Sequence, residues 1–145
     1  MKIATIIVRS LLGLMFVVSG SNMALHFFPL PPPAEDPARA FMTALVVSHF
    51  LYVVAAFEVA GGLLMLTGRW APLGLALLAP VIVNIFVFHV LMDPAGVGIG
   101  CVVAALALFL AWRYRENFAG LVKNAPVLSD LPRQATATEN AKVNP

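Results

Sequence analysis

Four long apolar segments constrain the fold of this chain more than any other feature. They run at about 3–28, 41–66, 72–91 and 97–114, and each is near the ~20 residues that a helix needs to cross ~30 Å of hydrocarbon. Because lipid offers no partner to an open strand's backbone groups, such segments must be helices. Composition agrees, since 61% of the residues are hydrophobic and 11% are charged, whereas soluble domains carry about 25% charged residues. The sequence predicts an all-α, integral membrane four-helix bundle.

The connections between these segments are short. Residues 29–40 are proline-rich and acidic, and we expect them to form a stiff external link. Residues 67–71 and 92–96 are predicted to be tight turns, which makes neighbouring helices antiparallel. The hydrophobicity falls sharply near the end of the fourth segment. We therefore expect a transmembrane domain over 1–118 and a flexible cytoplasmic tail over 119–145.

Basic residues predict the orientation. With the amino terminus in the cytoplasm, only Arg39 among the lysines and arginines falls on the outer side, beside Glu35, Asp36 and Asp93. This is the positive-inside pattern, and it predicts that both termini of a bacterial cytoplasmic-membrane protein lie in the cytoplasm.

The first segment has a second interpretation. Its basic start, apolar run and small residues Ser19-Gly20-Ser21 fit a cleaved secretory signal. Arg9 and the apolar character that continues to Phe28 argue for a retained helix. Removing the segment would leave the other three helices oriented as before.

Charge and cysteine content exclude several classes of function. The formal net charge of +2 is small and spread along the chain, so we expect no nucleic-acid partner. The single cysteine, Cys101, excludes an internal disulfide, a CxxC redox pair, a thiolate zinc site and a CxxCH haem attachment. Electron transfer would therefore need a borrowed cofactor or a partner.

Polar residues gather near the predicted outer surface. Counted from the outer helix ends, Asn22, His49 and Asn84 lie about 9–12 Å below it, on three different helices. A candidate outer polar pocket therefore contains Asn22, His26, His49, Tyr52, Asn84, His89 and Asp93. The same residues could instead form interhelical hydrogen bonds that serve packing alone. Asn84 and His89 are also roughly 140° apart around an ideal helix, so they do not point at one spot.

Arg9 and Glu58 form a second polar level. By helical rise, they lie about 10 Å and 12 Å above the inner surface, on the first two segments. A charge inside a bilayer costs at least ~2.5–3.5 kcal/mol, and pairing would offset that cost. We therefore expect an intramembrane Arg9–Glu58 ion pair. The alternative is that Arg9 extends to the interface and Glu58 is protonated.

The histidines raise the question of haem or metal. Imidazole binds both, and the three histidines lie on three helices at the same end. No HExxH spacing is present, and the heights of the histidines differ by several residues. We therefore expect neither a haem nor a metal site.

Three stretches resemble the DoxX-like family of small four-helix membrane proteins, over about residues 8 to 118. They are HFFPLPPP, AFMTALVVSHFLYVVAAFEVAGGLLMLTGRWAPLGLALLAP and VNIFVFHVLMDPAG. Some family members look like the small membrane subunit of thiosulfate:quinone oxidoreductases, and others are linked with oxidative-stress complexes or with assembly of membrane proteins. The resemblance implies Glu58, Asn84 and His89 as candidate functional positions.

Three functions follow as hypotheses. The first is a membrane subunit of a redox complex, with soluble oxidoreductase partners and a quinone headgroup in the outer pocket. The second is a non-catalytic scaffold or assembly factor. The third is a proton or small-solute transporter. It is less favoured because a chain of four helices without an inverted repeat is small for a transporter, although a homo-oligomer would be larger.

Overall fold

The computed structural model describes residues 2–29 and 32–122, and from residue 120 onward the backbone alone. Residues up to Arg115 form one compact unit, and the chain after them forms a second unit. Helix α6 (Arg115–Val122) extends beyond the predicted start of the tail at residue 119. The rest of that tail, 123–145, lies outside the described residues.

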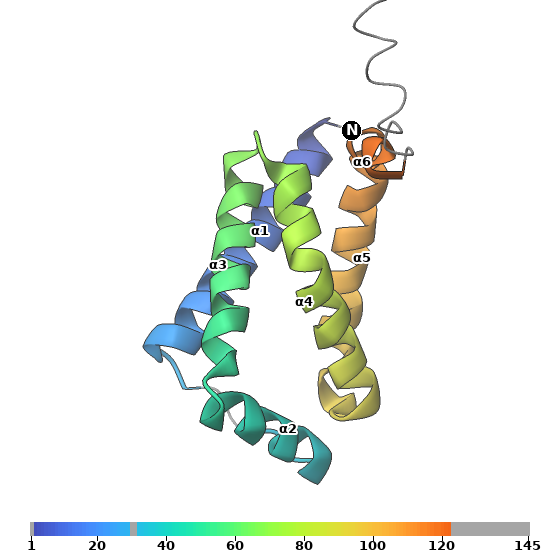
Figure 1. Ribbon diagram of the computed structural model, residues 1–145. Coiled ribbons are helices and arrows are strands. Elements are labelled where there is room, and N and C mark those ends of the chain that lie inside the picture. The colour runs from blue at the N-terminus through green and yellow to red at the C-terminus, as the bar shows by residue number, and fades with distance from the viewer. Residues whose placement is uncertain (1, 30–31, 123–145) are drawn as a thin grey trace, which may run out of the picture. The chain divides into compact units, whose positions relative to one another are not determined.

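Four helices of the first unit are long and apolar enough to cross a membrane. They are α1 (Lys2–Leu25), α3 (Phe50–Thr67), α4 (Ala71–Leu91) and α5 (Val97–Arg113), the last preceded by the short 3-10 helix η1 (Pro94–Gly96). The described residues contain helices and no strand. The predicted all-α class with four transmembrane helices is confirmed, and Figure 1 shows these helices side by side.

The sequence predicted one helix over 41–66, and this prediction is wrong. The segment is divided between α2 (Asp36–Val47) and α3, with a break at Ser48 and His49. His49 adopts a left-handed φ of 60°, which an α-helix cannot continue. The Ser48 hydroxyl accepts a hydrogen bond from the Phe50 backbone N–H at 3.4 Å. The break therefore leaves α3 with 18 residues, which is still enough for a span.

Helix α2 lies at one end of the bundle, at a steep angle to the spanning helices (Figure 1). Pro37 in its first turn starts the helix, because proline fixes φ and lacks the N–H that would have no partner there. Its Phe41 ring contacts the Phe88 ring of α4, with centroids 5.7 Å apart. Part of the segment predicted to form a stiff link thus belongs to a helix that contacts α3 and touches α4 through Phe41.

Glycines bring α1 and α3 into backbone contact. A Cβ atom at Gly62 would lie 2.7 Å from the Gly13 carbonyl oxygen, and one at Gly20 would lie 2.8 Å from the Ala55 carbonyl oxygen. Position 13 therefore faces position 62 while position 20 faces position 55, so the two helices are antiparallel. Helices in lipid gain little from hydrophobic association, and close backbone approach through small residues replaces it.

The same packing joins α3 to α4. A Cβ atom at Gly74 would lie 2.7 Å from the Gly61 carbonyl oxygen. Around these contacts lie large side chains that are at most 1% exposed: Leu12, Phe16, Met65, Leu78 and Leu110. The bundle core thus combines backbone contacts with a small set of fully buried side chains.

The two ends of the bundle differ in charge. At the Arg113 end, where α1 begins and α5 finishes, the basic residues are Lys2, Arg9, Arg69, Arg113 and Arg115. At the opposite end, the His89 end, Arg39 is accompanied by Glu35, Asp36 and Asp93.

Gly62→Ala should destabilise the bundle, because the added methyl group meets the Gly13 backbone. Forcing an extra group into a packed core costs about 1–3 kcal/mol. Gly98→Ala is the matched control, since a Cβ atom there meets nothing within 4 Å. We expect lower thermal stability in detergent micelles, followed by circular dichroism, for Gly62→Ala and no loss for Gly98→Ala. Equal behaviour of the two variants would contradict the glycine contact.

Candidate functional site

His89 and Asp93 form a side-chain pair at the His89 end. The imidazole Nδ1 lies 3.1 Å from the Asp93 Oδ2 atom, and each side chain is 19% exposed. When the Asp93 carboxylate is ionised it can only accept a hydrogen bond, and a protonated Nδ1 is then the donor. In the neutral ring, Nε2 then presents a lone pair. Both residues belong to the predicted outer pocket, and their i, i+4 spacing lets the two side chains meet.

Helix packing holds the His89 ring in place. A Cβ atom at Gly96 would overlap the ring atoms Cε1 and Nδ1, and one at Gly100 would lie 3.6 Å from Cδ2. The Phe88 ring meets the imidazole edge-on, with centroids 5.2 Å apart. The ring therefore lies against the glycine-rich start of α5. Among the described residues, Nε2 has no hydrogen-bond partner.

Asn22 has a local structural role. It is 4% exposed, and its Oδ1 atom accepts a hydrogen bond from the Phe28 backbone N–H at 2.9 Å. This bond holds the chain that leaves α1, where His26 has a left-handed φ of 53°. His26 itself is exposed.

The remaining candidates of the predicted outer pocket are exposed. The His49 and Tyr52 rings stack with centroids 6.1 Å apart, and both residues are exposed. Asn84 is exposed on α4 and does not contact His89 by a hydrogen bond. In the described part of the chain, no hydrogen bond links these candidates across helices. Among the described residues, the structure pairs His89 with Asp93 and stacks His49 on Tyr52.

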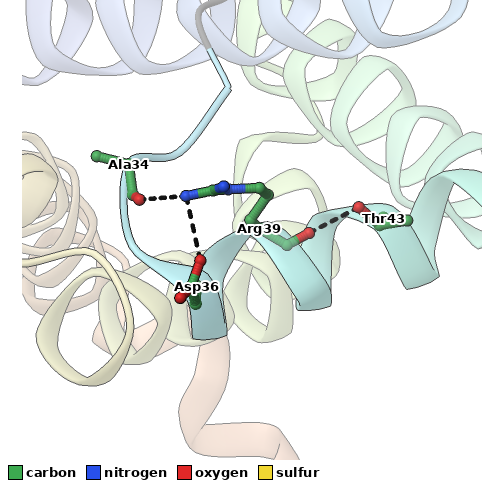
Figure 2. A network of polar contacts seen from close by, with 4 residues as sticks. All are labelled: Ala34, Asp36, Arg39 and Thr43. Atoms are coloured by element: carbon green, nitrogen blue, oxygen red, sulfur yellow. Dashed lines mark hydrogen bonds and ion pairs between the residues drawn. The ribbon is translucent and has the colours of Figure 1, made fainter.

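A polar network holds the start of α2 at the same end of the bundle. As Figure 2 shows, the Arg39 guanidinium donates to the Ala34 carbonyl oxygen and lies 3.3 Å from the Asp36 carboxylate. The Thr43 hydroxyl donates to the Arg39 carbonyl oxygen at 2.8 Å. These exposed groups shape the entry into α2, although an exposed ion pair contributes only about 0–1 kcal/mol.

Glu58 is buried where α1 meets α3. It is 1% exposed, its Cβ atom faces Gly20, and its carboxyl group has the Ser19 hydroxyl as a hydrogen-bond partner. The Oε2 atom is buried without a partner in the described residues. Burying a polar atom without a partner costs free energy that an apolar side chain would not cost, so packing alone does not explain a glutamate at this position.

The predicted Arg9–Glu58 ion pair is not formed. Glu58 faces Gly20, which is about 16 Å along α1 from Arg9 at 1.5 Å per residue. The Arg9 guanidinium instead lies against Gly68, at the end of α3. The prediction measured the depth of each residue from the end of its own helix and assumed that the ends of α1 and α3 lie at the same height. In the structure, Arg9 lies beside the last residues of α3.

The described residues contain no group of three histidine, cysteine, aspartate or glutamate side chains that could hold a metal ion. The polar side chains that the structure brings together at the His89 end are an imidazole and a carboxylate. Such a pair can transfer protons and form hydrogen bonds.

Comparison with known proteins finds similarity over most of this architecture. The sequence model of the DoxX family matches residues 4–90, which include Arg9, Glu58 and His89. The chain is also 28% identical over 120 residues to "Uncharacterized protein YwoB" of Bacillus subtilis (strain 168), covering 79% of this chain and 75% of that protein. No solved structure matches the chain.

A double-mutant cycle tests the separation of Arg9 from Glu58. The single substitutions Arg9→Gln and Glu58→Gln remove each charge without a large change in volume. Groups more than about 7–10 Å apart have effects on stability that add to within about 0.3–0.5 kcal/mol. We expect additivity in the free energy of unfolding, measured by denaturant titration in micelles. A coupling energy above about 1 kcal/mol would show that the two groups interact.

Proposed function

The chain belongs to the DoxX family, and from this premise we propose that it is a membrane subunit of a quinone-linked redox complex. The observation that carries the proposal is the His89–Asp93 pair, 3.1 Å apart, with Nε2 left open. DoxX-like proteins include chains that look like the small subunit of a quinone-reducing complex. The substrate expected here is therefore a quinone headgroup, and the expected partner is a soluble oxidoreductase subunit that supplies electrons.

The pair suits the proton part of this reaction. Reduction of a quinone to a quinol takes up two electrons and two protons. His89, when doubly protonated, donates a hydrogen bond and then a proton from Nε2 to one carbonyl oxygen. The Asp93 carboxylate accepts a hydrogen bond from Nδ1 and thereby orients the imidazole for that transfer. Solvent at the membrane rim supplies the second proton.

The surroundings of His89 suit an amphipathic ligand. The next two residues of α4, Val90 and Leu91, are 45% and 71% exposed, so exposed apolar side chains occur at the same end of the helix. Phe88 and Phe41 place two aromatic rings at the same end of the bundle. A headgroup at Nε2 would therefore have apolar surface along which its lipid tail could lie.

The charge difference between the two ends supports an orientation. Five basic residues lie at the Arg113 end, whereas Arg39 at the His89 end is accompanied by acidic residues. By the positive-inside rule, the Arg113 end faces the cytoplasm of a bacterial cytoplasmic membrane. The His89 pair then lies in the outer half of the bilayer.

His89→Asn should weaken quinone binding. Loss of the Nε2 hydrogen bond and of the pair with Asp93 should raise the dissociation constant of a short-tailed benzoquinone about tenfold, which corresponds to about 1.4 kcal/mol. The measurement is isothermal titration calorimetry of the protein in lipid nanodiscs. His49→Asn is the matched control at the same end, and asparagine tolerates the left-handed backbone there. Its affinity should not change.

Either of two results would contradict the quinone proposal. One is that the wild-type protein does not bind benzoquinone, and the other is that His89→Asn and His49→Asn weaken its binding equally. Co-purification of a protein complex without quinone binding would instead favour the scaffold function. Solute flux in proteoliposomes that depends on the protein would favour transport.

Cysteine labelling tests the orientation. Cys101 is an exposed free thiol, so it is first replaced by serine. A single cysteine is then introduced at Ala95, within η1, or at Arg69, at the other end. A membrane-impermeant maleimide added to intact cells should label the Ala95→Cys protein and leave the Arg69→Cys protein unlabelled. The reverse pattern would contradict the proposed orientation.

A further inference from the structure

A cavity at the Arg113 end gathers three basic side chains. Its volume is about 390 Å³, and Lys2, Arg9 and Arg113 contribute to its lining together with Thr5, Gly68 and Tyr114. The lining residues come from the start of α1, the end of α3 and the end of α5, and none of them is acidic. The volume is within the range of about 300–1,000 Å³ that small-molecule sites have.

The Arg9 guanidinium lines this cavity, and close packing restricts its position. Its guanidinium lies so close to Gly68 that a Cβ atom there would overlap Nη1 and Cζ. Gly68 has a φ of 74°, so both its conformation and its neighbour favour glycine. The Arg9 Nη1 atom is buried, and within the described residues it has no hydrogen-bond acceptor. A buried N–H donor without an acceptor is costly, and an anion in the cavity would supply one.

Arg113 is held beside it by a different contact. Its Nε atom donates to the Thr5 hydroxyl oxygen at 3.2 Å, and its Cζ atom lies 5.9 Å from the centre of the Trp112 ring. These contacts use Nε and one face of the guanidinium. The terminal nitrogens of Arg113 form no ion pair in the described part of the chain, so they remain able to bind an oxyanion.

We propose that this cavity binds a phosphate group, with Arg9 and Arg113 as its main donors. Planar guanidinium groups match the oxygens of phosphate with paired hydrogen bonds. The cavity lies at the helix ends, where Trp70, Trp112 and Tyr114 also lie, and such aromatic residues favour the membrane–water interface. The phosphate can come from an anionic phospholipid headgroup or from a free phosphate compound. This site is at the opposite end from His89 and does not depend on the proposed redox function.

The test compares lipid binding by variants that lose the same charge. The protein is reconstituted in nanodiscs of phosphatidylcholine with or without phosphatidylglycerol, and native mass spectrometry counts the phosphatidylglycerol molecules that stay bound. Arg9→Gln and Arg113→Gln should each lower retention about fivefold, the effect of losing about 1 kcal/mol of attraction per basic residue. Arg69→Gln is the matched control, because Arg69 is at the same end but does not line the cavity. Its retention should not change.

A second arm identifies the source of the phosphate. Inorganic phosphate is added to the wild-type protein in phosphatidylcholine nanodiscs, and thermal stability is measured. Stabilisation that Arg113→Gln abolishes indicates a free phosphate ligand, whereas retention of phosphatidylglycerol without such stabilisation indicates a lipid headgroup. Either result supports the site.

The proposal is overturned by either of two outcomes. One is the absence of both effects in the wild-type protein. The other is an equal loss in Arg69→Gln and Arg113→Gln, which would show diffuse surface attraction. If Arg9→Gln does not fold, Arg9→Lys replaces it. Lysine keeps the charge but loses the paired donors, so retention should still fall.

Discussion

Backbone contact between α1 and α3 is the constraint on which the rest of the structure depends. At Gly13, Gly20 and Gly62 an added Cβ atom would lie within about 3 Å of the facing helix, so the two helices approach until their backbones touch, and these contacts hold them in one register. That register determines the height of every polar group on either helix. It places Glu58 beside Gly20 and Ser19, and it places Arg9 at the end of α3 beside Gly68. The contact of Gly61 with Gly74 extends the same control to α4.

This register keeps the charged groups apart. An ion pair between Arg9 and Glu58 would need α1 to slide by about 16 Å, which no glycine contact permits. Arg9 consequently reaches the helix ends, where water and headgroups can solvate a cation. Glu58 stays at the centre with a hydroxyl partner and one unpaired oxygen. The proposed phosphate cavity and the His89 pair thus lie at opposite ends of the bundle.

Much of this architecture could be predicted from the sequence, because apolar length alone identifies membrane spans. The ends of α4 and α5 agree with the predicted 72–91 and 97–114 to within one residue. The break before α3 was missed because apolar residues continue on both sides of Ser48 and His49, and a left-handed histidine has no clear sequence signal. Pro37, after an acidic residue, was the available sign that a separate helix begins there. Of the site, the sequence placed His89 and Asp93 in one candidate pocket, and their i, i+4 spacing allows the observed pair. The surroundings of Arg9 depended on a helix stagger that hydropathy does not encode.

Glycine has a second role at both ends of the bundle, separate from helix contact. Gly68 leaves room for the Arg9 guanidinium, and Gly96 leaves room for the His89 imidazole. In each position a Cβ atom would overlap the functional group itself, because the ring or guanidinium occupies the space that a side chain would take. Both groups are therefore held by close packing before any ligand arrives, which lowers the entropy lost on binding. Gly96 lies outside the α1–α3 contact, so substitution there can change the His89 site while the register of α1 and α3 is kept. Gly68, in contrast, joins the end of α3 to Arg9 of α1.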